Sequence, residues 1–393
     1  MYNSDLSDRP TAPVTLQFPP PEISKSSEFP PGHARRRFLS RIGAAILAFL
    51  GLELAIFHSG FYTRILEPES TTGQYELILQ NEIRRPTPDH NQVLAVGHSR
   101  MALLPRIANE STPQTGYTYA SIALGGTTPR CWYYGLRAVD PTRHRYAAIL
   151  IPVDDYNEPD RYDYIGDRES DAHYLVSRLG IPDAPEFALS YSTRRLQAKM
   201  LWEVLFKSYV YRQDFQAFLP DPKARLEKVR LYRRESAGWY YGFNGDEFSL
   251  AGISVDWNDQ TIHYPEGLNQ GERNLVHNVL FEPLPPQTGQ MTEYFRHWYG
   301  RIAQYYEGTG TKLVFLRVPR GPVIAPVLPP VKQHSAVRDL ASHPGVTVMD
   351  EHFFDPLEKP ELFGDALHLN RAGLAEFSRM LAAEMPRILK QAN

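Results

Sequence analysis

The chain has 393 residues, of which 42% are hydrophobic and 22% charged, a composition typical of a folded protein with a sizeable core. The formal net charge of −3 leaves no excess of basic residues to neutralise phosphates, which argues against a nucleic-acid partner. Cys131 is the only cysteine of the sequence, so neither an intramolecular disulfide nor a cysteine-based zinc site can form.

The N-terminal residues 1–37 are predicted to form a disordered tail. Seven prolines lie within the first 34 residues, and no hydrophobic period is sustained there. Arg35, Arg36 and Arg37 then precede an apolar stretch. Because segments rich in Lys and Arg stay on the cytoplasmic side of a membrane, we expect the tail to be cytoplasmic and the rest of the chain to be exported.

Residues 38–62 are predicted to form a transmembrane anchor. The apolar run from Ile42 to Phe57 is interrupted by a charge only at Glu53. With its flanking residues, the run reaches the roughly 20 residues that a bilayer requires. A buried helix of a soluble domain would have a similar composition, and Glu53 favours that alternative. A cleaved signal peptide fits less well, because the segment begins late and has no clear A-x-A site.

From about residue 75 onward, short apolar runs alternate with segments of helical periodicity. The predicted strands are 92–96, 117–122, 146–153, 312–318 and 346–349. The predicted helices between and after them include 101–107, 128–139, 292–306 and 374–389. This alternation predicts an α/β domain over residues 75–393, with a mostly parallel sheet flanked by helices.

A long insertion is predicted at about residues 156–291, between the third strand and the next helix of the core pattern. Residues 196–210 and 222–233 within it have helical periodicity, and much of the remainder is rich in Tyr, Trp and Asp. Material inserted after a strand lies at the ligand-binding rim of an open α/β sheet, where it would act as a lid or a glycan platform. Alternatively, its aromatic residues fill a small core of their own.

Polar or glycine residues follow three of the predicted strands. Ser99 comes after the first strand, and Gly125 and Gly126 come after the second. The third strand is followed by Asp154 and Asp155, with Asn157 nearby. Because the carboxyl ends of parallel strands meet at one edge of a sheet, these residues are predicted to lie near one another.

Asp365 and His368 provide the remaining parts for nucleophilic catalysis. They are three residues apart near the start of the last helix, so the carboxylate can hold the imidazole in one tautomer while its other nitrogen faces a nucleophile. Ser99 would attack a carbonyl carbon and His368 would take its proton. Backbone N–H groups of Ser99 and Gly126 are the predicted oxyanion donors. In the alternative interpretation, Asp365 only caps the helix and His368 lies on the surface.

The order of these blocks resembles the SGNH (GDSL-type) hydrolase superfamily. The most specific match is D-x-x-H-L-N at 365–370, followed by a glycine, and G-H-S-R at 97–100 is a weaker one. The resemblance implies a serine, a glycine and an asparagine after the first three strands. The third block departs from this pattern, because residues 152–155 contain no asparagine and an ionised Asp cannot donate to an oxyanion. Asn157 is therefore the candidate third donor.

The N-terminal anchor, exported body and long insertion look like the membrane-anchored branch of that superfamily, which takes part in teichoic-acid D-alanylation and exopolysaccharide O-acetylation. The resemblance implies an acyl ester of an extracytoplasmic polysaccharide as substrate and a multispanning membrane O-acyltransferase as partner. Two functions remain open: a serine acyltransferase or esterase, and a non-catalytic accessory protein that positions the polymer or the acyltransferase.

Metal and nucleotide chemistry have little support in the sequence. His98 has neither an H-x-x-x-H spacing nor a carboxylate cluster beside it, so a metal hydrolase is a distant alternative. The glycines at 125 and 126 lack the Lys and Ser or Thr of a phosphate-binding loop. We therefore predict no cofactor and no metal.

Overall fold

The computed structural model of the chain describes residues 32–86, 91–158, 165–235, 249–281, 288–326 and 331–390. It divides into two units, Met1–Gly51 and Leu52–Asn393. Most of the tail predicted at 1–37 lies outside the described residues. The end of that segment is helical, because α1 (Gly32–Leu52) begins upstream of the apolar stretch.

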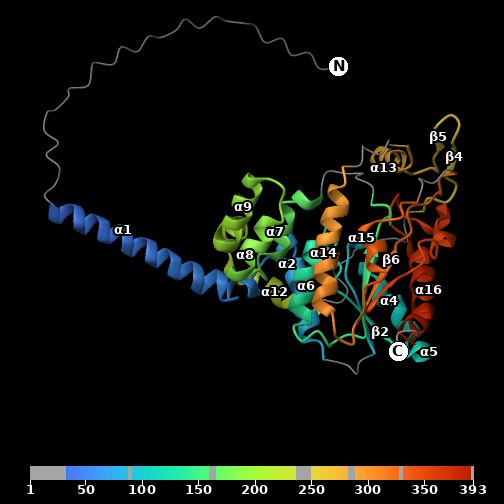
Figure 1. Cartoon of the computed structure of the whole chain (residues 1–393). Helices are drawn as coiled ribbons and strands as arrows, with labels where there is room; N and C mark the ends of the chain where they lie inside the picture. The colour runs from blue at the N-terminus through green and yellow to red at the C-terminus, as the bar shows by residue number, and fades with distance from the viewer. Residues whose placement is uncertain are drawn as a thin grey trace, which may run out of the picture. The chain divides into compact units, whose positions relative to one another are not determined.

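Helix α1 is a single long helix (Figure 1), and its residues are mostly apolar from Ile42 onward. The stretch Phe38–Arg64 is long and apolar enough to cross a membrane, and only 6% of its most apolar window is buried. Phe38 and Leu47, for example, are 63% and 71% exposed. The chain therefore has an N-terminal helix of the length and composition that a membrane span requires, and anchoring itself stays a prediction.

Glu53, the one charged residue in the apolar run, is buried within the second unit. It begins η1 (Glu53–His58), is 3% exposed, and accepts the Ser208 N–H at 3.1 Å. His58 Nε2 lies 3.1 Å from the Leu205 carbonyl oxygen. These bonds fasten η1 to α9 (Arg194–Leu205) and α10 (Lys207–Val210). A buried acidic side chain within the stretch Phe38–Arg64 therefore has a structural partner, at the point where the second unit begins.

The second unit is built on a parallel sheet with the strand order β2-β1-β3-β6-β7. The strands are β1 (Gln92–Ala95), β2 (Thr118–Ser121), β3 (Ala148–Val153), β6 (Lys312–Arg317) and β7 (Val346–Val348). All neighbouring pairs are parallel, which confirms the predicted α/β class. In this order β2 lies on one side of β1 and β3 on the other, so the direction in which strands are added reverses after β2. Such a reversal is a topological switch point, where open α/β sheets bind ligands.

Two hydrophobic cores cover the two faces of this sheet, because successive strand side chains point to opposite sides. Leu94 and Phe315 face one core, whereas Val93 and Leu316 face the other. Helices over the first face include α2 (Thr71–Arg84), α6 (Pro129–Val139) and α14 (Gln290–Tyr306). Helices over the second face include α4 (Leu104–Ala108) and α16 (Arg371–Lys390). Figure 1 shows the sheet between these two groups of helices.

All five predicted strands are present, with ends shifted by one or two residues. The predicted helix 101–107 is divided into α3 (Ser99–Ala102) and α4. Pro105 explains this break, since it has no N–H to donate to the carbonyl of Met101. Segment 196–210 is likewise divided into α9 and α10, and 222–233 forms α12 (Pro222–Glu235).

The first half of the insertion packs into the main core. Its helices α7 (Ser170–Leu175) and α8 (Ala184–Leu189) contribute buried side chains to the same cluster as the first face of the sheet. A fully buried ion pair joins it to α6, with Arg130 Nη1 2.9 Å from Asp171 Oδ2. The Arg130 guanidinium also donates to the Gly166 carbonyl oxygen and lies 3.9 Å from the ring centre of Tyr191. This half of the insertion is therefore continuous with the core.

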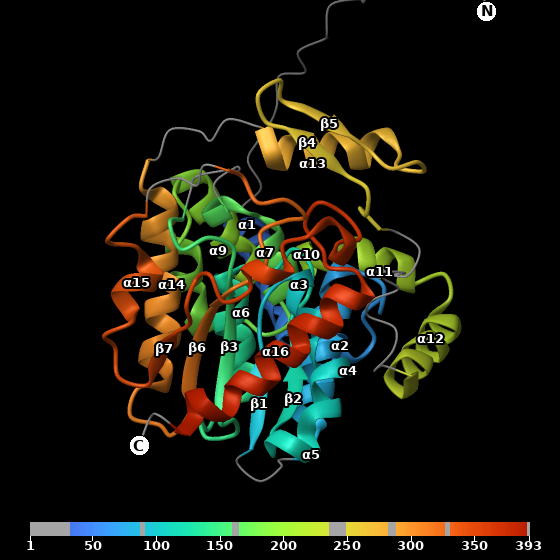
Figure 2. The ribbon, with the colours of Figure 1, turned by 90° about the vertical axis from the view of Figure 1, so that its right-hand side faces the viewer.

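The second half of the insertion packs against the loop that carries Asp365 and His368. Residues 249–281 form the hairpin β4 (Ser254–Asp256) and β5 (Thr261–His263) and the helix α13 (Gln270–Phe281). Their apolar side chains cluster with Phe363, Ala366, Leu367 and Leu369, and the Leu250 N–H donates to the Phe363 carbonyl at 3.0 Å. Figure 2 shows this hairpin and α13 at one end of the domain. The aromatic run 239–241 lies outside the described residues.

Candidate active site

Ser99 is the first residue of α3 and is positioned by a tight turn after β1. Gly97 in this turn has φ +131°, and a Cβ there would come within 2.4 Å of Pro152 Cγ. Only glycine therefore fits this position. His98 closes the turn, because its Nδ1 accepts the Arg100 N–H at 3.4 Å. The turn places the Ser99 hydroxyl at the carboxyl end of the sheet.

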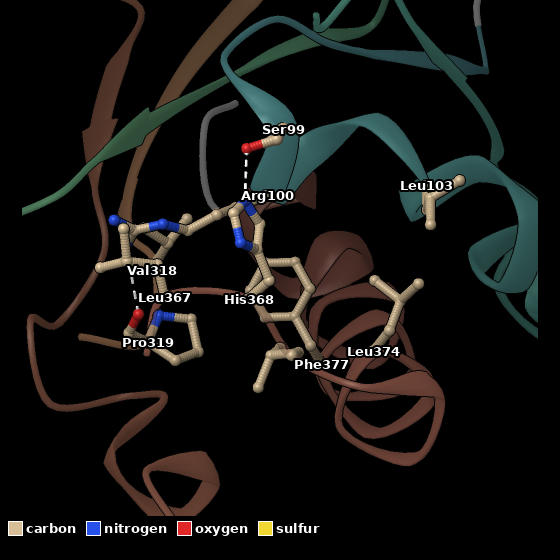
Figure 3. A pocket seen from close by; sticks show the side chains of 10 residues that line it. Ser99, Arg100, Leu103, Val318, Pro319, Leu367, His368, Leu374 and Phe377 are labelled. Carbon is tan, nitrogen blue, oxygen red and sulfur yellow. Dashed lines mark hydrogen bonds between the residues drawn. The ribbon is translucent and has the colours of Figure 1, made fainter. Parts of the chain in front are cut away.

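Ser99, His368 and Asp365 form a continuous chain of hydrogen bonds. Ser99 Oγ is 2.6 Å from His368 Nε2, as Figure 3 shows, and His368 Nδ1 is 2.9 Å from Asp365 Oδ2. The His368 and Asp365 side chains are 30% and 28% exposed, so the site is reachable from solvent. The geometry suits a neutral imidazole that donates from Nδ1 to the carboxylate and accepts the serine proton at Nε2.

The Asp365–His368 pair lies in a tight loop before α16 rather than on the helix itself. Asp365 Oδ1 accepts the N–H groups of Leu367 and His368, both at 2.8 Å. Burial opposes ionisation, but His368 and these two N–H groups hold the pKa of the Asp365 carboxyl below its usual range. Asn370 caps α16 instead, because its Oδ1 accepts the Gly373 N–H at 3.0 Å. Asp365 is therefore not the helix cap of the alternative interpretation.

The glycine that lies directly against Ser99 is Gly125. A Cβ on Gly125 would be 3.7 Å from Ser99 Cβ, so a larger side chain there would reach the nucleophile. Gly126, the predicted oxyanion donor, has φ +79°, and a Cβ there would meet Tyr174 Oη at 2.7 Å. Tyr174 in turn donates to the Gly125 carbonyl at 2.8 Å. Helix α7 thus supports this glycine turn, and donation by the Ser99 and Gly126 N–H groups stays a prediction.

Asn157 is held by a different part of the fold. It is 9% exposed, and its Oδ1 accepts from the Lys332 N–H at 3.0 Å and from Arg338 Nη1 at 3.2 Å. Its own N–H donates to Asp155 Oδ1 at 2.7 Å. These contacts fix its side-chain carbonyl among residues that follow the fourth strand of the sheet. They do not involve the side-chain NH₂ group of Asn157, so its role as third oxyanion donor stays a prediction.

Asp154 is the residue of the third strand end that contacts both neighbours of Ser99. Its Oδ1 is 3.1 Å from His98 Nε2 and 3.4 Å from Arg100 Nη2. Desolvation by nearby protein atoms opposes ionisation of the Asp154 carboxyl, although 64% of the side chain is exposed. The positive charges of Arg100 and His98 outweigh this desolvation and lower the pKa of the carboxyl. Asp154 was predicted at this edge without a role, and Arg100 was not predicted as a site residue. The only sequence feature that could have identified the two residues is a charged side chain shortly after a predicted strand.

A cavity of about 210 Å³ opens beside the hydroxyl of Ser99. Its walls come from the segment around Leu103, the end of β6, the loop that carries His368, and α16. Apart from Ser99, Arg100 and His368, the lining residues are all apolar. Within the described part of the chain, no group of three or more His, Cys, Asp or Glu side chains is placed to hold a metal ion.

The structure thus brings Ser99, His368, Asp365 and the glycine turn together, and holds Asn157 through other partners. No family model matches the chain, and no curated protein matches it significantly.

Proposed function

We propose that the protein is a serine acyltransferase or esterase of the SGNH type. The observation that carries this proposal is the hydrogen-bond chain Ser99–His368–Asp365, formed by segments that are 269 residues apart in sequence. It lies beside the switch point of the sheet, where open α/β folds bind ligands. Three side chains that suit one reaction therefore meet at the edge where that reaction is expected.

In the proposed reaction, Ser99 Oγ bonds to the carbonyl carbon of an ester while His368 Nε2 takes the serine proton. The tetrahedral intermediate then collapses, the bond to the alcohol oxygen breaks, and His368 returns the proton to that oxygen. Water or a second hydroxyl attacks the acyl-serine by the same steps and restores Ser99. Asp365 stays ionised throughout and stabilises the imidazolium.

The oxyanion would be stabilised by backbone N–H groups of Ser99 and the glycine turn, each worth on the order of 3 kcal/mol of barrier. Asn157 remains the proposed third donor. Asp154 occupies the place where the superfamily has its asparagine block, and its lowered pKa keeps it an acceptor at neutral pH. This substitution is the one observation that favours the second candidate function, a non-catalytic accessory protein with an SGNH-like fold.

The proposed location is the cell membrane, with a cytoplasmic N terminus and an extracytoplasmic catalytic domain. The arginines in the first turns of α1 and the apolar stretch Phe38–Arg64 that follows them support it. Protease added to intact spheroplasts should digest the region after Tyr62 and spare the N-terminal tail. Protection of the body would reverse this topology and exclude a surface substrate.

The proposed substrate is an acyl ester of a cell-surface or secreted polysaccharide, and the proposed partner is a multispanning membrane O-acyltransferase. Both rest on the resemblance of the ordered blocks and the N-terminal anchor to the membrane-anchored SGNH branch. A cheap check is the gene neighbourhood, where a multispanning acyltransferase is expected.

Fluorophosphonate labelling tests the proposed nucleophile. The purified full chain should form an adduct that mass spectrometry maps to Ser99, because His368 increases the nucleophilicity of its hydroxyl. The adduct should be lost in His368→Ala. A matched control is His334→Ala, which removes a surface histidine whose Nδ1 is 3.0 Å from Asp339 Oδ1 and should leave labelling unchanged.

The absence of an adduct on a folded protein would favour the accessory function. Because a membrane partner can be required for activation, the labelling is repeated in native membranes. A serine that is unlabelled there too, or a label that persists in His368→Ala, contradicts the proposed mechanism.

A further inference from the structure

We propose that the cavity beside Ser99 binds the acyl chain, and that it selects an apolar acyl group of about six to eight carbons over an acetyl group. This inference rests on the proposed serine chemistry and names the substrate class for that site.

The cavity is continuous with the reacting atoms, because Ser99 and His368 are part of its lining. In Figure 3, Leu374 and Phe377 project from α16 beside His368, and Leu103 lies across from Val318 and Pro319. An acyl group bonded to Ser99 Oγ therefore has an apolar space next to its carbonyl carbon. The leaving alcohol must lie on the other, solvent-exposed side of that carbon.

The lining suits a hydrocarbon better than a sugar. Its three polar residues have other partners: Ser99 and His368 bond to each other, and Arg100 Nη1 donates to the Pro319 carbonyl at 3.3 Å. Arg100 Nη2 also lies 3.4 Å from Asp154 Oδ1. A sugar in this space would leave its hydroxyls without partners among the apolar lining residues, which is unfavourable. An alkyl chain there would lose no hydrogen bonds.

The size of the cavity limits the chain length. An apolar cavity of about 150 Å³ binds benzene, which has six carbons. At the same packing, the cavity of about 210 Å³ accommodates roughly eight carbons. An acetyl group would leave most of it empty. Each further methylene buried should raise kcat/KM about fourfold, the equivalent of about 0.8 kcal/mol.

The test compares p-nitrophenyl esters from acetate to decanoate on the full chain in lipid nanodiscs. We expect kcat/KM to rise to an optimum at hexanoate or octanoate, with hexanoate about 250-fold above acetate because it has four further methylenes to bury. Leu374→Trp should fill the cavity and lower the octanoate-to-acetate ratio of kcat/KM by about a hundredfold. This ratio does not depend on the fraction of folded protein. Partitioning of the esters into the nanodisc is the same for wild type and variant, so it cancels when their ratios are compared. Leu103→Phe should fill less of the cavity, from the opposite wall, and lower the same ratio by a smaller factor.

Leu189→Trp is the matched control, because Leu189 is 69% exposed at the end of α8 and is not among the cavity lining residues. Its octanoate-to-acetate ratio should equal that of wild type. If Ser99 is labelled by fluorophosphonate but acetate is the preferred ester, the proposed function stands and this inference is wrong. An unchanged ratio in Leu374→Trp also contradicts it.

A binding measurement keeps the two proposals separate. If no ester is turned over, the proposed function is in doubt, and the cavity is tested by NMR titration of Ser99→Ala with octanoate and acetate. We expect octanoate to bind at least tenfold more tightly, and this preference to be lost in Ser99→Ala/Leu374→Trp. Equal affinities for the two carboxylates would overturn the acyl-chain assignment whatever the fate of the catalytic proposal.

Discussion

Asp365→Asn should lower the turnover of an ester substrate by about 10⁴-fold, as the loss of an orienting carboxylate does in a related triad. The side-chain carbonyl of the introduced asparagine can still accept the Leu367 and His368 N–H groups, so the loop should keep its shape. What is lost is the negative charge opposite His368 Nδ1 and the tautomer that it selects. The measurements are kcat with p-nitrophenyl hexanoate and the thermal unfolding temperature of the same sample.

Asp339→Asn is the matched control, since Asp339 contacts the exposed His334 on the surface and should change kcat by less than twofold. A loss below tenfold in Asp365→Asn would show that the carboxylate does not orient His368.

The lowered pKa of Asp365 also predicts how its contribution to stability changes with pH. Because the pKa of Asp365 is lowered in the folded protein, its stabilising effect is complete above the unfolded value of about 3.9 and is lost as pH falls through the folded value. The stabilisation that the Asp365 carboxylate provides, measured as the difference in free energy of unfolding between wild type and Asp365→Asn, should therefore be constant from about pH 8 to about pH 5 and decline below about pH 4.

Arg130→Met should lower the free energy of unfolding by about 3–5 kcal/mol, because it leaves a buried carboxylate without its partner. Both Arg130 and Asp171 side chains are 0% exposed, and the guanidinium donates to Gly166 and Ser190 carbonyls of the insertion. Asp171→Asn should have a similar effect, since it leaves the guanidinium uncompensated. Chemical denaturation of the full chain, followed by tryptophan fluorescence, measures both.

The control is Arg379→Met, which removes an exposed ion pair with Glu376 on α16 and should change stability by less than about 1 kcal/mol. The double variant Arg130→Met/Asp171→Leu should recover part of the loss, because no unpaired buried charge remains. A destabilisation below about 1 kcal/mol in both single variants would mean that water reaches the pair.

Local sequence patterns were sufficient to predict the sheet and much of the site. The strand run 148–153, for example, is buried on both faces and therefore reads as a continuous apolar segment. Ser99 and Asp154 were placed at one edge because residues that follow parallel strands must lie there. The helices α2, α7 and α8 were missed. The last two are six residues each, too short for a clear helical period, and are held by packing against the core.

Local patterns in the sequence were sufficient to predict the parallel α/β class, the apolar stretch before the domain, and Ser99, His368 and Asp365 as members of one candidate site. Each depends on neighbours a few residues apart, through side-chain periodicity and turn chemistry. Packing between distant segments brings Ser99 to His368, places Gly125 rather than Gly126 against Ser99, and buries Glu53 against α10. The apolar cavity beside Ser99 is also a tertiary feature. It exists only where α16 and the end of β6 approach Leu103, and no local pattern encodes the distance between elements that are distant in the chain.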